Sequence, residues 1–240
     1  MENEARIISE VTAALEREPA INLHRFPVHL EFHDGALIME GEVEEIRAKK
    51  RALEVAAALP GVTGIVDRLR ILPAERMEDG EIRDHVCNSL LAENLLATCA
   101  VRAIVKGKAE VASGGEGGEG CIDVEVNRGV VVLNGAVPSL SAKRLAGVLA
   151  WWVPGSRDVV NGIEVVPLEE DNDDEVVDAI RLVLEKDPFV NAAQIRVRCR
   201  NYAVSLEGIV KNDTQRHMAE ADCWYVFRVD RVANRLLVEE

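Results

Sequence analysis

The sequence predicts an α+β protein made of three tandem modules, each with the element order helix, strand, strand, helix, strand (αββαβ). Three observations predict it. A tight turn that runs into an apolar strand ending on glycine occurs at residues 33–41, 127–135 and 200–208. A constant spacing then separates this glycine from a later acid or amide, in the pairs Gly41 and Asp67, Gly135 and Asn161, and Gly208 and Asn234. The helical stretch between these landmarks carries small residues at matching offsets: Ala52, Ala146 and Ala219, then Ala56, Ala150 and Cys223. A repeat of this length is typical of a chain built from copies of one supersecondary unit.

The first copy is predicted to consist of helices at 4–17 and 45–59 and strands at 28–32, 36–40 and 64–72. Apolar residues at helical spacing, Ile7, Val11 and Leu15, predict the first helix. Asp34-Gly35 is a typical hairpin turn between two alternating strands, and Pro60-Gly61 ends the second helix.

The second copy starts near Asp79 and repeats the helical stripe with Ile82, Val86 and Leu90. Strands are predicted at 121–126, 130–134 and 158–166, with a helix capped by Ser141 and ending at Val153. Residues 100–120 are an insertion whose Gly-rich part, 113–120, predicts a flexible loop.

The third copy is predicted to have a helical stripe over 176–184, strands at 195–199, 203–207 and 232–238, and a helix at 213–226. The resulting domain boundaries are 1–72, 79–167 and 175–240, joined by linkers at 73–78 and 168–174. The second linker is strongly acidic, which suits a solvated approach to a helix N-terminus.

Composition restricts the function classes. The net charge of −14 argues against a nucleic-acid partner, because that affinity comes from Lys and Arg neutralising phosphates. The N-terminus has no signal-peptide pattern and no apolar run reaches membrane-spanning length, so we expect a cytoplasmic protein. The five cysteines occur in unrelated contexts and are interpreted as small core residues.

Three local motifs resemble ligand sites. Residues 115–120 match the dinucleotide fingerprint Gly-x-Gly-x-x-Gly, but a strand follows instead of a helix. His29, Glu31 and His33 share one strand face as a metal site would require, although His33 belongs to the turn and the other copies lack the pattern. Residues 171–175 hint at a calcium loop, but Val176 occupies the position that requires glycine. With no nucleophile motif either, the sequence predicts no cofactor, no metal and no catalytic site.

The aromatic residues give the candidate binding site. All three tryptophans lie at the ends of second helices, near further aromatic and arginine side chains, and this set comprises Trp151, Trp152, Arg157, Trp224, Tyr225, Phe227, Arg228 and Arg231. Such a combination suits a membrane interface or a protein anchor site. Packing of the tryptophans between repeats, or within the helix–sheet core, is the structural alternative.

The landmark residues resemble the BON domain, named for bacterial osmotically induced and nodulation proteins. The matching features are the apolar strand that ends on glycine and the later Gly-Val-x-x-Val-x-Asn pattern, which appears at 61–67, with serine substituted at 155–161, and without its glycine at 228–234. The third copy also has Tyr202 where the turn glycine is expected.

The resemblance implies that each module folds as two helices on one face of a three-stranded mixed sheet. It also implies a non-catalytic module that associates with protein partners or phospholipid membranes. We therefore expect a non-enzymatic binding or scaffolding protein that acts through a protein partner or self-association. The alternative is a peripheral phospholipid-binding stress or envelope protein, which the missing signal peptide counts against.

Overall fold

The computed structural model describes residues 2–113 and 118–239. Residues 114–117 fall in the Gly-rich segment, so the predicted flexibility at these positions and half of the nucleotide fingerprint (residues 115–117) lie outside the described residues. The chain divides into two compact units, Met1–Leu72 and Pro73–Glu240. The first unit holds the first repeat and the second unit holds the other two.

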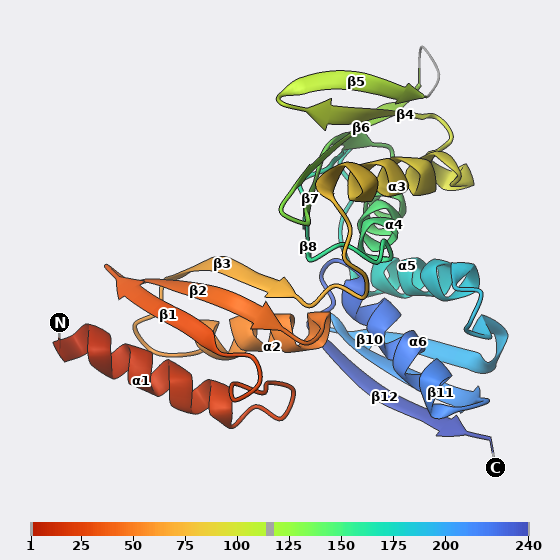
Figure 1. Ribbon diagram of the computed structural model, residues 1–240. Helices are drawn as coiled ribbons and strands as arrows, with labels where there is room; N and C mark the ends of the chain where they lie inside the picture. The colour runs from red at the N-terminus through yellow and green to blue at the C-terminus, as the bar shows by residue number, and fades with distance from the viewer. Residues whose placement is uncertain (1, 114–117, 240) are drawn as a thin grey trace. The chain divides into compact units, whose positions relative to one another are not determined.

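The first unit contains α1 (Glu2–Glu16), β1 (Val28–His33), β2 (Ala36–Val43), α2 (Ile46–Ala57) and β3 (Gly64–Ile71). Its sheet has the order β1-β2-β3, antiparallel between β1 and β2 and parallel between β2 and β3. Both helices lie on one face of this mixed sheet (Figure 1). Alternate strand residues such as Leu37 and Met39 face the helices and are fully buried. The predicted module architecture is confirmed here.

The second unit contains two further modules. The second repeat consists of α3 (Asp79–Leu91), β4 (Cys99–Val105), β5 (Lys108–Ser113), β6 (Gly120–Asn127), β7 (Val130–Val137), α4 (Leu140–Trp151), β8 (Asp158–Asn161) and β9 (Glu164–Val165). The third consists of α5 (Asp173–Lys186), β10 (Ile195–Arg200), β11 (Ala203–Val210), α6 (Asp213–Tyr225) and β12 (Arg231–Val238). The third sheet repeats the first, in the order β10-β11-β12.

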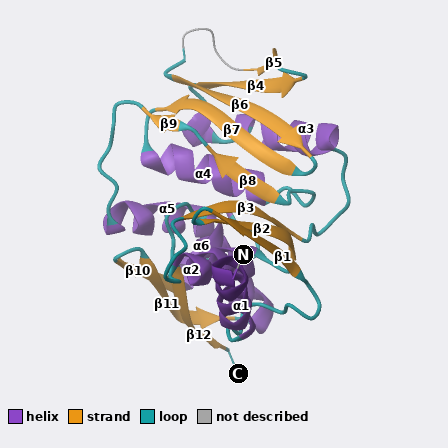
Figure 2. Ribbon diagram, turned by 90° about the vertical axis from the view of Figure 1, so that its left-hand side faces the viewer, coloured by secondary structure: helices purple, strands orange, loops and turns teal. Residues whose placement is uncertain are grey.

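The insertion in the second repeat differs from the prediction. Residues 99–113 form a β-hairpin of β4 and β5, and β4 pairs in parallel with β6, so the sheet grows to the order β5-β4-β6-β7-β8 (Figure 2). Val101 is buried because alternate residues of β4 extend the core-facing side of the sheet. No strand was predicted within this insertion, because its Gly-rich composition outweighed the short apolar alternation of 99–105.

Several element boundaries also differ. Ser139, not Ser141, caps α4, and its hydroxyl accepts a hydrogen bond from the Ala142 amide. The single strand expected at 158–166 is broken into β8 and β9, which both pair with β7. The end of the acidic linker forms the first turn of α5, because the Asn172 side chain accepts bonds from the amides of Asp174 and Glu175.

The second and third repeats pack against each other through their helices. Helix α4 contacts α5 and α6 as well as its own sheet. Nine of its residues are buried, and one continuous hydrophobic core runs through both repeats. A helix that is apolar on nearly all sides is buried on more than one face. The two repeats therefore form one body.

The landmark glycines permit a close approach of neighbouring strands. A Cβ on Gly208 would lie 2.0 Å from the Gln194 carbonyl oxygen, and one on Gly135 would lie 2.2 Å from that of Cys121. Both glycines also have positive φ, +141° and +114°. Only glycine accommodates this combination without strain.

The landmark amides tie the last strand of each module to its second helix. The Asn161 side chain donates to the Lys143 carbonyl at 2.8 Å, and the Asn234 side chain donates to the Arg216 carbonyl at 2.9 Å. In the first repeat the carboxylate of Asp67 has no proton to donate. The ammonium of Lys49, at the position equivalent to Lys143, instead donates to Asp67 at 2.9 Å and to the Leu69 carbonyl at 2.8 Å.

Candidate functional site

The contact between the second and third repeats contains three of the predicted site residues. Trp152, at the end of α4, donates its indole N–H to the Asp222 carboxyl of α6 at 3.0 Å. Trp151 stacks on Tyr225, with ring centroids 5.7 Å apart and an interplanar angle of 22°. These contacts favour the structural alternative considered above, that tryptophans pack between repeats.

Asp222 is a buried acid in this contact, with 4% of its surface exposed. Burial, together with the neighbouring Asp187 carboxyl, raises the pKa of Asp222 to about 8, against a smaller lowering by the Trp152 hydrogen bond. At neutral pH the group is therefore largely protonated. A neutral carboxyl is the form that a dry interface tolerates.

Arg144 is a second buried polar group between the repeats, and its side chain is fully inaccessible. It donates to the Asp171 carboxylate at 2.6 Å and to the Phe227 carbonyl at 3.4 Å. The acidic linker thus supplies the counterion for a buried cation of α4. A buried cation is tolerated only when it is paired in this way.

The residues around Phe227 form an exposed rim beside this contact. The Phe227 ring is 43% exposed, and the Lys143 ammonium lies 5.1 Å from its centroid. Burial and the adjacent Arg144 lower the pKa of Lys143. The Arg228 guanidinium lies 4.4 Å from the centroid of the Tyr202 ring. Arg228 has φ +67° where the first repeat has Gly61 at +94°, so the left-handed backbone persists without the glycine.

The remaining predicted site residues lie elsewhere. Trp224 is 3% exposed, and its indole lies 3.4 Å from the Glu220 carboxylate within α6. The stem of Arg157 lies over the turn between β6 and β7, within 2.8 Å of where a Gly129 Cβ would be, and Arg231 is exposed at the start of β12. The predicted set is therefore partly a contact between repeats and partly an exposed rim.

Sequence analysis missed Arg144, Asp222 and Asp187 as members of this contact. The equivalent positions in the other repeats are occupied by Lys50 and His217, and this polar pattern predicts that Arg144 lies on a solvent-exposed helix face. The available signal was the composition of α4, whose apolar residues occupy nearly every side of the helix.

Two of the acids that hinted at a calcium loop have structural partners. Asp171 pairs with Arg144, and Asp173 accepts hydrogen bonds from the turn amides of Asn201 and Tyr202 at 2.8 and 2.9 Å. These two bonds lower the pKa of Asp173. Asp79 binds the turn amides of Arg128 and Gly129 in the same way in the second repeat. In the second and third repeats, the acid at the start of the first helix thus holds the hairpin turn in place.

Within the described residues, the cysteine thiols and the suggested metal ligands give little evidence of a reactive or metal-binding site. Burial raises the pKa of Cys87 to about 11 and that of Cys199 to about 12, so both are protonated thiols at neutral pH. Of the suggested metal ligands, His29 contacts Glu31 at 3.1 Å on an exposed strand. Residues 2–113 and 118–239 contain no group of three side chains that could hold a metal ion.

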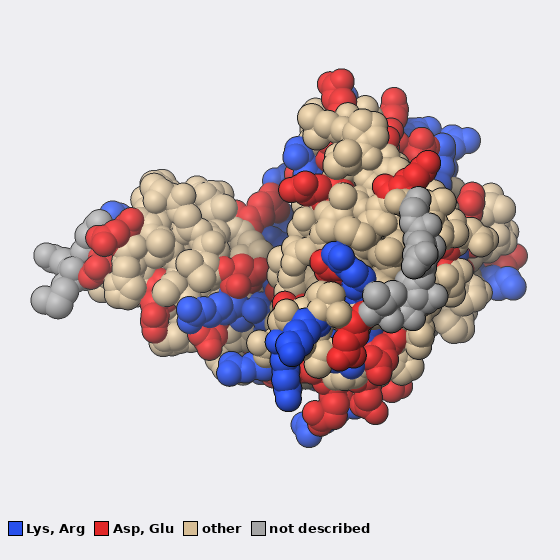
Figure 3. All heavy atoms as spheres, turned by 90° about the horizontal axis from the view of Figure 1, so that it is seen from above, with Lys and Arg blue, Asp and Glu red and all other residues tan. Residues whose placement is uncertain are grey.

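The surface and the helices add two further observations. On the face seen in Figure 3, acidic and basic side chains are interspersed. No helix within the described part of the chain combines the length and apolar character needed to cross a bilayer.

Comparison with known proteins identifies the family. The BON domain model matches residues 3–73, 106–167 and 172–240. The second match begins inside the inserted hairpin, which separates α3 from the rest of its module. No curated protein matches the chain.

Two solved structures of CdsD, a structural protein of the type III secretion system of Chlamydia trachomatis, are similar to this chain. The C-terminal domain of CdsD is 15% identical, with 98% of each chain covered and a TM-score of 0.25. The second CdsD structure is 16% identical, covering 98% of this chain and 94% of that one, with a TM-score of 0.24. Because the BON model accounts for most of the sequence in three separate segments, the chain belongs to the BON domain family.

Proposed function

We propose that this protein is a non-enzymatic binding or scaffolding protein whose second and third repeats form one rigid platform for a protein partner. The observation that carries the proposal is the continuous core between these repeats, closed by the buried contacts of Arg144 and Asp222. Modules joined by a small polar contact move independently, whereas a hydrophobic interface fixes their relative orientation. A fixed orientation is what a scaffold requires.

Phe227 and Arg228 are the members of the predicted site that lie exposed on this rim. Aromatic and arginine side chains are typical of the residues that anchor protein interfaces. We propose this rim as a binding surface of the platform.

The test is affinity capture with the full chain as bait in an extract of its own organism, followed by identification of the retained proteins. A specific partner that is recovered again with purified components supports the proposal. Its loss with Phe227→Ala/Arg228→Ala places the site on the rim. The matched control is Phe26→Ala/Arg25→Ala, which removes another phenylalanine and arginine that lie within 5.0 Å of each other. Failure of the wild-type chain to retain any partner would count against a binding function.

A second candidate function is peripheral binding to phospholipid. The observation in its favour is the half-exposed Phe227 ring beside Lys143, since an aromatic ring with an adjacent cation suits the bilayer interface. The net charge of −14 opposes binding to anionic lipid. Flotation with neutral and with anionic vesicles tests this function, and protein that stays in the unbound fraction with both excludes it.

A further inference from the structure

The third sheet has one face covered by helices and one open face. Val197, Leu206 and Leu236 point to the helices and are buried. Because side chains alternate along a strand, the intervening residues lie on the open side. This open side carries five exposed arginines, which we call the basic face: Arg196, Arg198 and Arg200 on β10, and Arg231 and Arg235 on β12.

The arginines of β10 form one line and those of β12 form a second line, and the strand register sets the two lines opposite each other across β11. Arg200, Ala203 and Arg231 lie in one row across the sheet, and Arg196, Glu207 and Arg235 lie in another. The central strand β11 thus separates the lines with smaller side chains such as Ala203. Its only acid on this side, Glu207, lies 3.7 Å from Arg198 and 3.8 Å from Arg235. Because these two arginine side chains are 59% and 69% exposed, most of the positive charge remains open to a partner.

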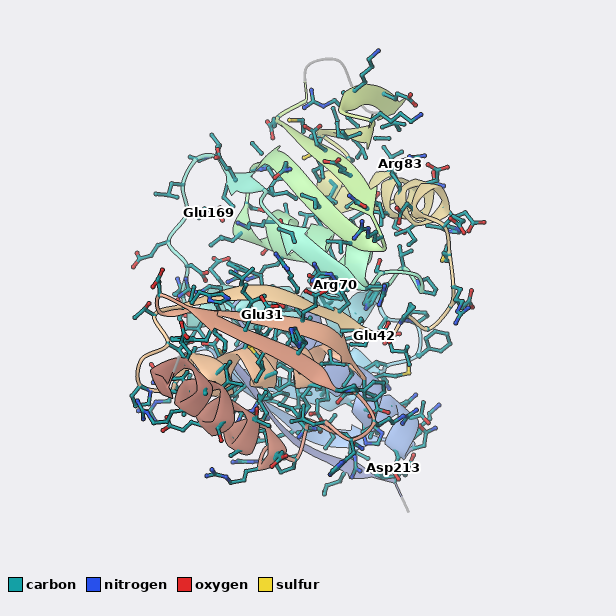
Figure 4. The ribbon with its side chains drawn as sticks, turned by 60° about the vertical axis from the view of Figure 1, so that its left-hand side comes forward. Glu31, Glu42, Arg70, Arg83, Glu169 and Asp213 are labelled. Atoms are coloured by element: carbon teal, nitrogen blue, oxygen red, sulfur yellow. The ribbon has the colours of Figure 1, made fainter. Side chains whose placement is uncertain are left out.

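Among the residues that the structure describes, the other two sheets show no comparable group of exposed arginines. On the first sheet Glu31 and Glu42 accompany Arg70, as Figure 4 shows. On the second sheet Arg102 is held by Asp123 through two hydrogen bonds of 2.5 and 2.8 Å. In a protein with a net charge of −14, the concentration of arginines is therefore particular to the third repeat.

The edge of β10 offers a second mode of recognition. In the described residues β10 pairs only with β11. Asn201 and Tyr202, with φ of 50° and 58°, form the two-residue turn between these strands. In a hairpin with a two-residue turn, the residues that flank the turn form a hydrogen-bonded pair, here Arg200 and Ala203. Hydrogen-bonded pairs then alternate along the ladder, so the backbone N–H and C=O groups of Arg200, Arg198 and Arg196 face β11. The backbone N–H and C=O groups of Val197 and Cys199 consequently point away from the sheet.

Space is available beside the start of this strand. An open hollow of about 520 Å³ is lined by Arg181 of α5, by Gln194 of the 3-10 helix η2 (Ala192–Gln194) and by Arg196, among others. It places a further arginine near the edge. A chain entering along β10 would have room for its side chains at this end.

We propose that β10 receives an extended acidic segment of a partner protein as a fourth strand, with carboxylates at alternate positions beside Arg196, Arg198 and Arg200. Alternate residues of an extended chain are about 7 Å apart, which is the spacing of these arginines along β10. Opposite charges on neighbouring strands attract each other, and the guanidinium fork matches a carboxylate. This inference rests on the proposed binding function and specifies the chemistry of the partner.

A protein segment fits these observations better than other anions do. Only a peptide supplies backbone groups that can pair with the outward groups of Val197 and Cys199. A bilayer or a nucleic acid would use the arginines alone, and the net negative charge of the chain opposes both. The proposed mode therefore combines sequence-independent strand pairing with a requirement for alternating acids.

The test measures binding of fluorescent peptides to the full chain by anisotropy. The probe is a peptide with alternating Glu and Thr, compared with a block peptide of the same composition and with a probe N-methylated at alternate amides. The variant Arg196→Glu/Arg198→Glu/Arg200→Glu reverses the basic line. The matched control, Arg6→Glu/Arg25→Glu/Arg68→Glu, makes the same change of net charge at exposed arginines of the first unit.

We expect the basic-line variant to weaken binding of the alternating probe by roughly tenfold or more, while the control variant changes it about twofold or less. The block and N-methylated peptides should also bind more weakly. If the charge-reversed chain loses its native circular dichroism, the corresponding Arg→Gln triple variant replaces it. Equal binding of all three peptides, equal binding by both variants, or binding to anionic vesicles or RNA but not to the probe would overturn the inference.

Affinity capture separates this inference from the proposed function. A partner that the basic-line variant retains in full would overturn the acidic-strand inference and leave the binding function in place. Absence of any partner with the wild-type chain would count against the binding function itself.

Discussion

The Trp152 indole N–H donates to the Asp222 carboxyl at 3.0 Å across the contact between the second and third repeats. The donor lies at the end of α4 and the acceptor lies within α6. A hydrogen bond to a buried acceptor helps to fix the orientation of two modules, because separating the modules would take the donor away from that acceptor. The bond also couples the contact to the protonation of Asp222.

Stability should therefore depend on pH through Asp222. Its pKa is about 8 in the folded protein and near the ordinary carboxyl value of 3.8 when unfolded. Between these pH values the folded chain binds one more proton than the unfolded chain, so the contribution of Asp222 to stability is fully present below about pH 4 and is lost as the pH rises to about 8. Asp222→Asn keeps an acceptor but cannot ionise. We expect the stability of this variant relative to wild type to increase by up to about 1.4 kcal/mol per pH unit across the window.

Urea unfolding from about pH 5 to about pH 9 measures this difference. Comparison with the variant cancels the general repulsion within an acidic chain. Parallel curves for the two proteins would show that Asp222 ionises normally.

Loss of the buried cation should destabilise the second unit. Arg144→Ala leaves Asp171 without its counterion and opens space in the core, so we expect a loss of about 3–5 kcal/mol in the free energy of unfolding. Arg181→Ala is the matched control, because Arg181 is exposed on the surface of α5 beside the exposed Asp178, and the change should alter stability by about 0.5 kcal/mol or less. Comparable losses in both variants would contradict the role assigned to Arg144.

The strand-ending glycine of the third repeat should not tolerate a side chain. In Gly208→Ala the new Cβ would meet the Gln194 carbonyl oxygen, and its φ of +141° is unfavourable as well. We expect a loss of more than about 2 kcal/mol. Gly80→Ala should instead raise the free energy of unfolding by about 0.5–1 kcal/mol. Gly80 lies in α3, and the nearest atom to its added Cβ would be 3.8 Å away. Thermal unfolding of both variants decides the point.

The first repeat should depend on Lys49 where the others depend on asparagine. Lys49→Met removes the cation that pairs with Asp67 and should lower the stability of the first unit by about 1–3 kcal/mol. Adding Asp67→Asn supplies the amide that Asn161 and Asn234 provide in the other modules. The double variant should therefore be more stable than Lys49→Met alone, as measured by chemical unfolding of both. A further loss in the double variant would show that the two arrangements are not equivalent.

Much of the fold could be read from the sequence because its signals are local and occur three times. The small residues Ala52, Ala146 and Ala219 are fully buried, as their matching offsets predicted, and Cys223 belongs to the core. The strand-ending glycines mark positions where the backbone geometry requires glycine. The landmark amides mark hydrogen bonds between the last strand and the second helix of a module. These features depend on residues within one module, so repetition alone was enough to recognise them.

The candidate site could be predicted only in part. The sequence placed Trp152, Phe227 and Arg228 near helix ends. It did not indicate which site residues lie in the contact between the repeats and which are exposed on the rim. Trp151 and Trp224 occupy equivalent positions, yet Trp151 is partly exposed and stacks on Tyr225 while Trp224 is buried. Equivalent residues acquire different environments when different modules cover them.

Periodicity and turn chemistry act over short distances, so the number of modules, their common element order and many of their core residues could be predicted from the sequence alone. The tertiary structure decided that the second and third repeats share a core, that Arg144 finds Asp171 and Trp152 finds Asp222, and that residues 99–113 extend a sheet. These outcomes depend on which surfaces meet, and that choice is made by the summed burial of many side chains distant in the sequence.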